Sequence, residues 1–339
     1  MEASPMHGLT LAPVRFGIGR VLPGALLTLC IAGAALLLHG LPQLHLLSAL
    51  ILAAMLGAVV RNTGLVPTAC APGQAFVLRR VLRMAIVLLG FQISLGQALA
   101  IGGTGLLIVV FAVAATFAAT LWLGRRMGLD ARFVCLIAAG TAVCGASAIV
   151  AANTVAEAPE EDVAYAIACV TVLGTASIFL YPPLAAAAGL TARQYGLWSG
   201  GSIHEVAQVV AAAFQRGDVA GHLGTVAKLC RVALLAPLVA VLALRRTAAG
   251  AERVKTPPPW FLAGFVVAIA VNSAVHLPAA LTQGIATATG LSMAMALAAM
   301  GLATDLRVVV ARGPRPLLLA VAAWLFVMLS VLGLVTYVA

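Results

Sequence analysis

Charged residues are scarce in this sequence. Only 9% of its 339 residues are Asp, Glu, Lys or Arg, and 63% are hydrophobic, with a mean hydropathy of +1.11. Soluble proteins carry about 25% charged residues. Apolar runs of about 17 to 25 residues recur along the chain, the length that an α-helix needs to cross a bilayer. These runs are continuous rather than alternating, which excludes a transmembrane β-barrel. The composition therefore predicts an all-α polytopic membrane protein.

Several motifs of enzymes and cofactor sites are missing. The six cysteines fall singly, without a CxxC pair for zinc or redox chemistry. The stretch from His204 begins like the HExxH zinc motif, but Gln208 stands where the second histidine is needed. No GxxxxGK[ST] phosphate loop is present, and no basic stripe with interleaved aromatics indicates nucleic acid. We expect no cofactor, no metal site, no nucleic-acid partner and no enzymatic activity. An intramembrane serine protease built on Ser147 and His204 stays open as an alternative.

The positive residues predict the topology. Eleven ranges are predicted to span the membrane: 21–40, 45–60, 84–100, 104–123, 133–154, 163–187, 195–213, 224–244, 260–276, 281–303 and 316–338. With the N-terminus inside, seventeen of the twenty Lys and Arg residues fall on the inner side, as cytoplasmic loops require. We therefore expect a cytoplasmic N-terminal segment over 1–20, a single transmembrane transporter domain over 21–338, and the C-terminus outside.

Two internal similarities appear. Residues 84–112 match residues 295–323 at an offset of 211, and the identical pairs include Gly90 with Gly301 and Gly102 with Gly313. In the predicted topology these helix pairs run in opposite senses, an arrangement typical of inverted-repeat secondary transporters. A second similarity, of 140–152 with 200–212, has an offset of 60 and runs parallel. The two offsets do not combine into one repeat unit.

Glycines and ionisable residues meet in the same spans. Pairs of glycines, Gly140 with Gly145 and Gly200 with Gly201, loosen a helix and predict two broken spans. The N-terminus of a half-helix carries partial positive charge and favours an anion.

His204 and Glu205 lie inside one of these spans, where charge is costly unless it is paired or faces a cavity. Gln208 can share a helix face with either residue. A structural hydrogen-bond clamp between helices is the alternative role for this group.

Lys228 and Arg231 share one face of another span. Two cations against the single carboxylate of Glu205 favour an anionic substrate. If Glu205 is instead a coupling carboxylate with Lys228 as its partner, the protein is a cation/proton antiporter of the same architecture.

Three stretches carry a family resemblance: CGASAI at 144–149, GGSIHEVAQV at 200–209, and GLATDLR at 301–307 followed by Gly313, Arg315 and Pro316. They resemble the YeiH family of bacterial inner-membrane proteins, which are described as sulfate exporters, and the likeness runs from about residue 15 to 338. The resemblance implies an architecture related to sodium/proton antiporters and bile acid symporters, with two broken helices near the midplane. Carried over residue by residue, the family's pattern picks out Cys144, Gly145, Ser147, Ser202, His204, Glu205 and Gln208. The family's usual serine in the third stretch is Ala303 here, so a role for that hydroxyl is not carried over.

Together these features predict a secondary transporter of the bacterial inner membrane that moves a small oxyanion such as sulfate, sulfite or an organosulfonate. The expected partners are this anion and the lipid bilayer, and a homodimer is an open alternative. The predicted substrate-binding residues are Gly140, Thr141, Cys144, Gly145, Ser147, Gly201, Ser202, His204, Lys228 and Arg231. The predicted proton-coupling residues are His204, Glu205 and Gln208. Histidine suits proton transfer because it changes charge near neutral pH.

Overall fold

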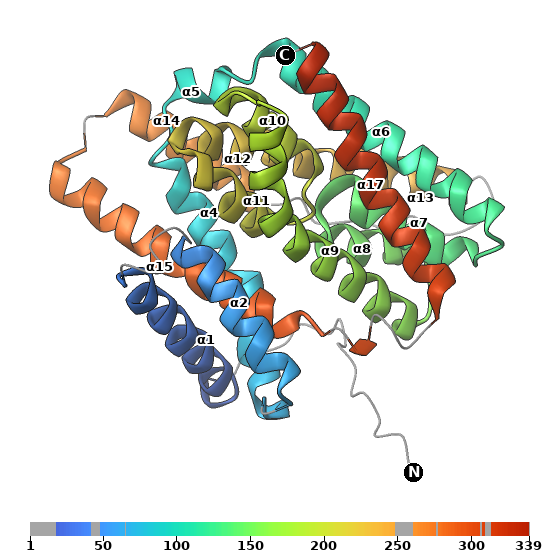
Figure 1. The fold of residues 1–339 in the computed structure, drawn as a ribbon, viewed down its shortest axis with the longest axis horizontal. Coiled ribbons are helices and arrows are strands. Elements are labelled where there is room, and N and C mark those ends of the chain that lie inside the picture. Colours follow the sequence, from blue (N-terminus) through green and yellow to red (C-terminus); the bar gives the residue numbers. More distant parts are fainter. Residues whose placement is uncertain are drawn as a thin grey trace.

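The computed structural model describes residues 18–41, 48–64, 66–247, 260–275, 277–305, 307–308 and 313–338. Every regular element within these ranges is a helix (Figure 1), which confirms the all-α class. Among the described residues, six helical segments are long and apolar enough to cross a membrane: Gly19–His39, Gly102–Arg126, Glu160–Ala187, Asp218–Leu244, Ala279–Ala303 and Pro314–Tyr337. The predicted segment 1–20 lies outside the described residues except for its last three, which begin the first helix.

The helices pack in two groups (Figure 1). The first group contains α1 (Ile18–His39), α2 (Ala49–Asn62), α3 (Ala71–Phe76), η2 (Val77–Val81), α4 (Leu82–Gly90), α14 (Trp260–Ala274) and α15 (Ala279–Ala303). The second contains α6 (Gly102–Arg126), α7 (Ala131–Ala139), η3 (Gly140–Cys144), α8 (Ala146–Ala156), α9 (Glu160–Ala187), α10 (Ala192–Ser202), α11 (Val206–Ala213), α12 (Asp218–Ala233), α13 (Leu235–Thr247) and α17 (Pro314–Tyr337). The groups meet where α15 touches α9 and α11, and the short α5 (Leu95–Leu99) contacts both α12 and α14.

Each predicted span contains one helix or consecutive helices, with differences in detail at several of them; the span 84–100, for example, is interrupted between Gly90 and Leu95. The third helical stretch begins at Ala71 rather than 84, because three arginines that resemble a loop in the sequence lie within η2 and α4. The predicted span 224–244 is interrupted at Leu234. Pro237 has no N–H to donate to the Ala233 carbonyl, so the regular hydrogen-bond ladder cannot continue there.

The repeat at an offset of 211 extends to a third helix. This offset places α2 on residues 260–273, which is the range of α14, and it places the ends of α4 and α6 on α15 and α17. The packing is reciprocal: α2 packs against α15 where Gly57 meets Gly301, and α14 packs against α4 at Gly90. The matched glycines Gly102 and Gly313 both have positive φ, 64° and 84°, at the start of their helices. The three-helix correspondence therefore has a structural basis.

The contact between α2 and α15 gives a stability prediction. A Cβ at Gly301 would overlap the backbone of α2 at Ala54 and Ala58. Gly301→Val should destabilise the protein by about 1–3 kcal/mol, the usual cost of overpacking. Gly290→Val is the matched control, because Gly290 lies on the same helix with no heavy atom within 4 Å of its added Cβ. Thermal melting in detergent checks this expectation, and equal melting temperatures for the two variants would contradict it.

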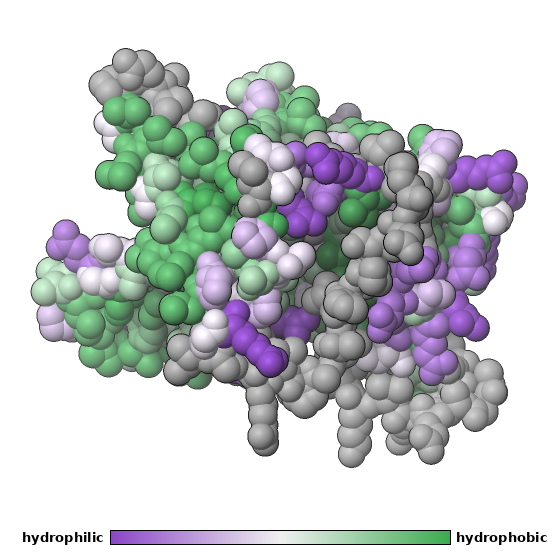
Figure 2. Space-filling view, turned by 90° about the horizontal axis from the view of Figure 1, so that it is seen from below, coloured by the Kyte–Doolittle hydropathy of each residue, from purple (hydrophilic) through white to green (hydrophobic). Residues whose placement is uncertain are grey.

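One side of the molecule suits lipid. Helix α1 exposes five leucines, Leu22, Leu26, Leu29, Leu36 and Leu37. Figure 2 shows hydrophobic surface over much of the end of the molecule where Figure 1 places α1 and α15, with hydrophilic residues in the middle of this face and toward the other end. Exposed apolar surface of this extent is stable against hydrocarbon rather than water.

Candidate functional site

Two helices in the second group are broken, as predicted. Helix α7 begins at the N-cap Asp130, continues through the π-helix η3, and stops at Gly145, where φ is 59° and ψ is −127°. Helix α8 restarts at once with Ala146. The second break separates α10 from α11, where Ile203 and Glu205 have extended backbone conformations. Each break leaves a helix C-terminus and a helix N-terminus inside the helix group.

Only one of the four glycines predicted to break these helices does so. Gly145 occupies the break itself, with a backbone conformation that other residues rarely adopt. Gly140, Gly200 and Gly201 lie inside helical segments. A Cβ at Gly200 would overlap the Gly224 carbonyl of α12, so this glycine serves close helix packing instead. The second break is formed by residues 203–205, three positions after the glycines.

Lys228 and Arg231 cap the C-terminal ends of both first half-helices. The Lys228 ammonium donates to the carbonyls of Val143, at 2.7 Å, and Ile203, at 2.8 Å. Arg231 donates from Nε to the Ala142 carbonyl at 2.6 Å, from one terminal nitrogen to the Ile203 carbonyl at 3.0 Å, and from the other to the Thr141 carbonyl. Both side chains come from α12 and are fully buried. They neutralise the partial negative charge of two helix C-termini that point at the same place.

The carboxylate of Glu205 lies at a helix N-terminus, whereas the two cations lie at helix C-termini. The Ala146 N–H, at the N-terminus of α8, donates to Glu205 Oε1 at 2.6 Å. The approach is this close because Gly145 has no side chain, and a Cβ there would overlap the carboxylate. The backbone of Glu205 is held separately, since its N–H donates to Gln208 Oε1 at 3.1 Å. Gln208 Nε2 donates in turn to the Thr171 carbonyl of α9 at 3.2 Å.

Several buried polar atoms beside these charges have no hydrogen-bond partner within the described part of the chain. They are both ring nitrogens of His204 and the hydroxyl of Thr141. Lys228 and Arg231 both act electrostatically on His204, and Arg231 acts on Tyr181. Buried polar groups are normally hydrogen-bonded, so these atoms are suited to hold a small polar ligand.

Tyr181 was missed by the sequence analysis. It lies in the C-terminal part of the apolar helix α9, directly before Pro182 and Pro183, with no motif to single it out. Its ring stacks on Trp198 of α10 at a centroid distance of 4.2 Å, and the Trp198 indole donates to the Met328 carbonyl of α17 at 2.8 Å. The phenol is thus fixed by three helices.

The accessible edge of the site lies at the first break. Ser147 is exposed and Glu205 is half-buried, whereas His204 is fully buried. The hydroxyl of Ser147 lies 2.7 Å from the sulfur of Cys144. Neither His204 nitrogen bonds to it, so the nucleophile–base contact that a serine protease uses is not formed. The buried hydroxyl of Ser202 donates to the Trp198 carbonyl within its own helix.

Most of the predicted site residues therefore come together. The two breaks and the adjoining face of α12 gather Thr141, Cys144, Gly145, Ser147, His204, Glu205, Gln208, Lys228 and Arg231. Gly140, Gly201 and Ser202 lie in the half-helices that lead into the breaks, where they pack or bond within the protein. The sequence predicted these residues as one group but did not indicate their backbone partners.

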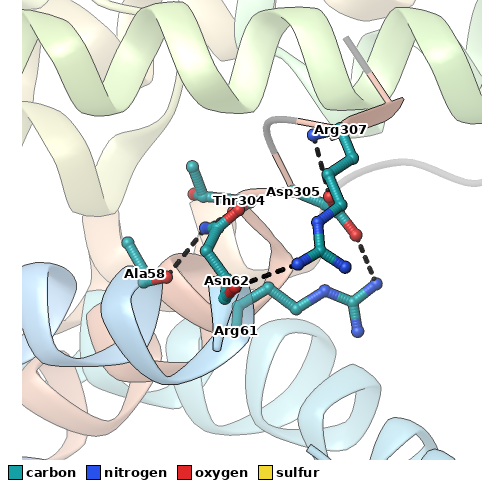
Figure 3. Close-up of polar contacts among 6 residues, drawn as sticks. All are labelled: Ala58, Arg61, Asn62, Thr304, Asp305 and Arg307. Atoms are coloured by element: carbon teal, nitrogen blue, oxygen red, sulfur yellow. Dashed lines mark hydrogen bonds and ion pairs between the residues drawn. The ribbon is translucent and has the colours of Figure 1, made fainter. Parts of the chain in front are cut away.

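The third family-like stretch makes a different cluster (Figure 3). Arg61 at the end of α2 forms an ion pair with Asp305 at 2.9 Å, and Asn62 donates to the Thr304 carbonyl at 3.0 Å. Arg307 donates to the Asn62 carbonyl at 3.3 Å. The Arg61 and Asp305 side chains are 38% and 22% exposed, and such exposed pairs contribute about 0–1 kcal/mol. The cluster ties the end of α15 to α2, within the first helix group.

Known proteins are similar to this sequence over almost its whole length. The family model described as "Conserved hypothetical protein 698" matches residues 23–320. The UPF0324 inner membrane protein YeiH of Salmonella typhi is 37% identical over 335 residues, which cover 95% of this chain and 96% of the relative. The UPF0324 membrane protein TauZ of Paracoccus denitrificans is 36% identical over 335 residues, which cover 95% and 97% of the two chains. The similarity agrees with a multi-pass inner-membrane protein.

Proposed function

Because this chain belongs to the UPF0324 family of membrane proteins, we propose that it is a secondary transporter that moves a small oxyanion across the bacterial inner membrane. Sulfate, sulfite and organosulfonates are the substrates we expect. The observation that carries the proposal is the meeting of two broken helices around four buried or half-buried ionisable side chains: His204, Glu205, Lys228 and Arg231. Ionisable groups inside the bilayer are costly, and they commonly mark a substrate or ion pathway.

We propose that the chain crosses the membrane eleven times, with its N-terminus in the cytoplasm and its C-terminus outside. Reciprocal packing of α2 with α15 and of α4 with α14 supports an inverted repeat. Such repeats, with discontinuous helices at the midplane, are typical of sodium/proton antiporters and related secondary transporters. Four of the positive residues used for this topology, Arg15, Arg253, Lys255 and Arg312, lie outside the described residues.

The charges of the site favour an anion over a cation. The partial charges of two helix C-termini and two helix N-termini offset each other, since each is about half an elementary charge. Two side-chain cations then face one carboxylate, which leaves an excess of about one positive charge. In the alternative function, a cation/proton antiporter, Glu205 would have to coordinate the cation. The bond from Ala146 to its carboxylate speaks against that alternative.

In the proposed mechanism the anion binds at the breaks. The N–H groups at the N-terminus of α8 and the hydroxyl of Thr141 are the hydrogen-bond donors offered to it. Lys228 and Arg231 bond to backbone carbonyls at the breaks, and their positive charges attract the anion without direct contact. His204 and Glu205 hold and release the coupled proton.

Labelled sulfate counterflow in proteoliposomes tests the proposal. His204→Ala should lower the counterflow rate at least about tenfold, since a hydrogen bond to a charged group is worth about 1.5–3 kcal/mol. His39→Ala, which alters a histidine at the end of α1, is the control and should transport as the wild type does. Unchanged rate and pH dependence in both His204→Ala and Glu205→Gln would refute the mechanism. A folded wild type that moves none of sulfate, sulfite and methanesulfonate would refute oxyanion transport.

A further inference from the structure

We propose that Glu205 is a built-in competitor of the substrate: its carboxylate occupies the place of the oxyanion at the N-terminus of α8, and the oxyanion binds there only when Glu205 is neutral. This inference rests on the proposed function and specifies how anion and proton are coupled. It names the substrate as a molecule with an oxyanion group, one oxygen of which takes the place of the carboxylate oxygen at this helix end.

The geometry provides the first support. The eleven-residue helix α8 directs its first N–H at Glu205 Oε1, at 2.6 Å, so an anionic oxygen already sits at this helix end. Gly145 leaves the approach open, because any side chain there would overlap the carboxylate. A site shaped for one carboxylate oxygen fits the oxygen of a sulfonate, sulfite or sulfate equally well.

His204, which precedes Glu205 in the chain, provides the second support for a ligand at this place. His204 is fully buried, and neither of its nitrogens bonds to any described residue. The imidazole ring can donate a hydrogen bond to a second oxygen of a bound oxyanion. A carboxylate of the protein fills only the α8 part of this site, whereas a tetrahedral oxyanion presents further oxygens to His204.

Glu205 can leave the contact without disturbing the fold. Its backbone N–H is fixed by Gln208, which is itself bonded to α9, so the side chain can rotate while the break keeps its shape. The carboxylate is half-buried and lies beside Ala146, next to the exposed Ser147. The neutral carboxyl group therefore has a route toward the accessible edge of the site.

The shared position at the N-terminus of α8 makes the two anions exclusive. The charged and titratable groups that act on Glu205 are Lys228 from α12 and Cys144 from η3, and His204 precedes it in the chain. An oxyanion beside an ionised Glu205 would place two negative groups at the single N–H of Ala146, where they would repel each other. An oxyanion beside a protonated Glu205 replaces the carboxylate as the negative group at this position. The expected coupling is one proton, taken up from water by Glu205, for each anion bound.

The experiment measures sulfate binding to the purified, detergent-solubilised protein by titration calorimetry between pH 5.5 and 8.5. In the wild type, sulfate affinity should fall about tenfold per pH unit where Glu205 is ionised, as linkage to one proton requires. Glu205→Gln should bind sulfate at every pH with the affinity that the wild type reaches only in acid. Glu160→Gln removes an exposed carboxylate at the start of α9 and should behave as the wild type does.

A native-like Glu205→Gln that keeps the wild-type pH dependence, or that no longer binds sulfate, would overturn the competitor role while leaving transport intact. If Glu205→Gln does not fold, proton uptake by wild-type proteoliposomes during sulfate entry decides instead. About one proton per sulfate is expected, and sulfate entry without proton uptake would overturn the inference. Failure of the wild type to bind or transport sulfate, sulfite and methanesulfonate at any pH would refute the proposed function itself.

Discussion

Arg231→Leu should leave little folded protein in the membrane. Without the guanidinium, the carbonyls of Thr141 and Ala142 lose their only side-chain donor, and the Ile203 carbonyl keeps only Lys228. Each buried polar group left without a partner costs about 1–3 kcal/mol. Two negative helix ends would also face each other with one cation between them instead of two. A loss of this size is a large part of the about 5–15 kcal/mol by which folded proteins are stable.

The yield of monodisperse protein after detergent extraction and its melting temperature measure this effect. Arg193→Leu is the matched control, because Arg193 is an exposed arginine in the first turn of α10 and makes no bond to either break. Arg231→Lys keeps the charge with fewer donors and should fall between the wild type and Arg231→Leu. If Arg231→Leu is as stable as Arg193→Leu, capping by Arg231 does not hold the broken helices together.

The sequence was informative about which residues meet, because burial cost is a property of side-chain type. His204, Glu205, Lys228 and Arg231 are too polar for lipid, so each had to turn toward the others. Their bonding partners could not be predicted. The sequence suggested Glu205 as the counter-ion of a cation, whereas the cations bond to backbone carbonyls and Glu205 bonds to a backbone N–H. Every residue has these backbone groups, so only the three-dimensional structure shows which of them lack a partner within a helix and can bond to a side chain.

The glycines illustrate the same limit. Gly140, Gly145, Gly200 and Gly201 look alike in the sequence, as small residues in apolar spans. Their roles differ because their neighbours differ: Gly145 has the positive φ of a break, and Gly201 faces Val331 of α17. The predicted start at 84 missed the first part of the helical stretch from Ala71 to Gly90. Its arginines are typical of a loop, although the backbone stays helical there.

Gly145→Ala should abolish most sulfate transport while reducing stability only moderately. The backbone at φ 59° and ψ −127° is strained for any residue with a Cβ, at a cost of about 1–3 kcal/mol. The larger effect is on the site: the methyl group would overlap the Glu205 carboxylate and push it away from the N-terminus of α8. The oxyanion would meet the same methyl group. We expect counterflow to fall at least about tenfold, which corresponds to about 1.4 kcal/mol of lost binding.

Gly189→Ala separates strain from site chemistry. Gly189 follows α9 with φ of 63°, and an added Cβ has no heavy atom within 4 Å. This variant should lose some stability but transport sulfate with the wild-type pH dependence. The contrast with Gly145→Ala assigns the transport defect to the space between Gly145 and Glu205, because both variants place a methyl group at positive φ. If the two variants transport equally well, the contact between Glu205 and α8 is not part of the transport cycle, and Glu205 serves only to close the break.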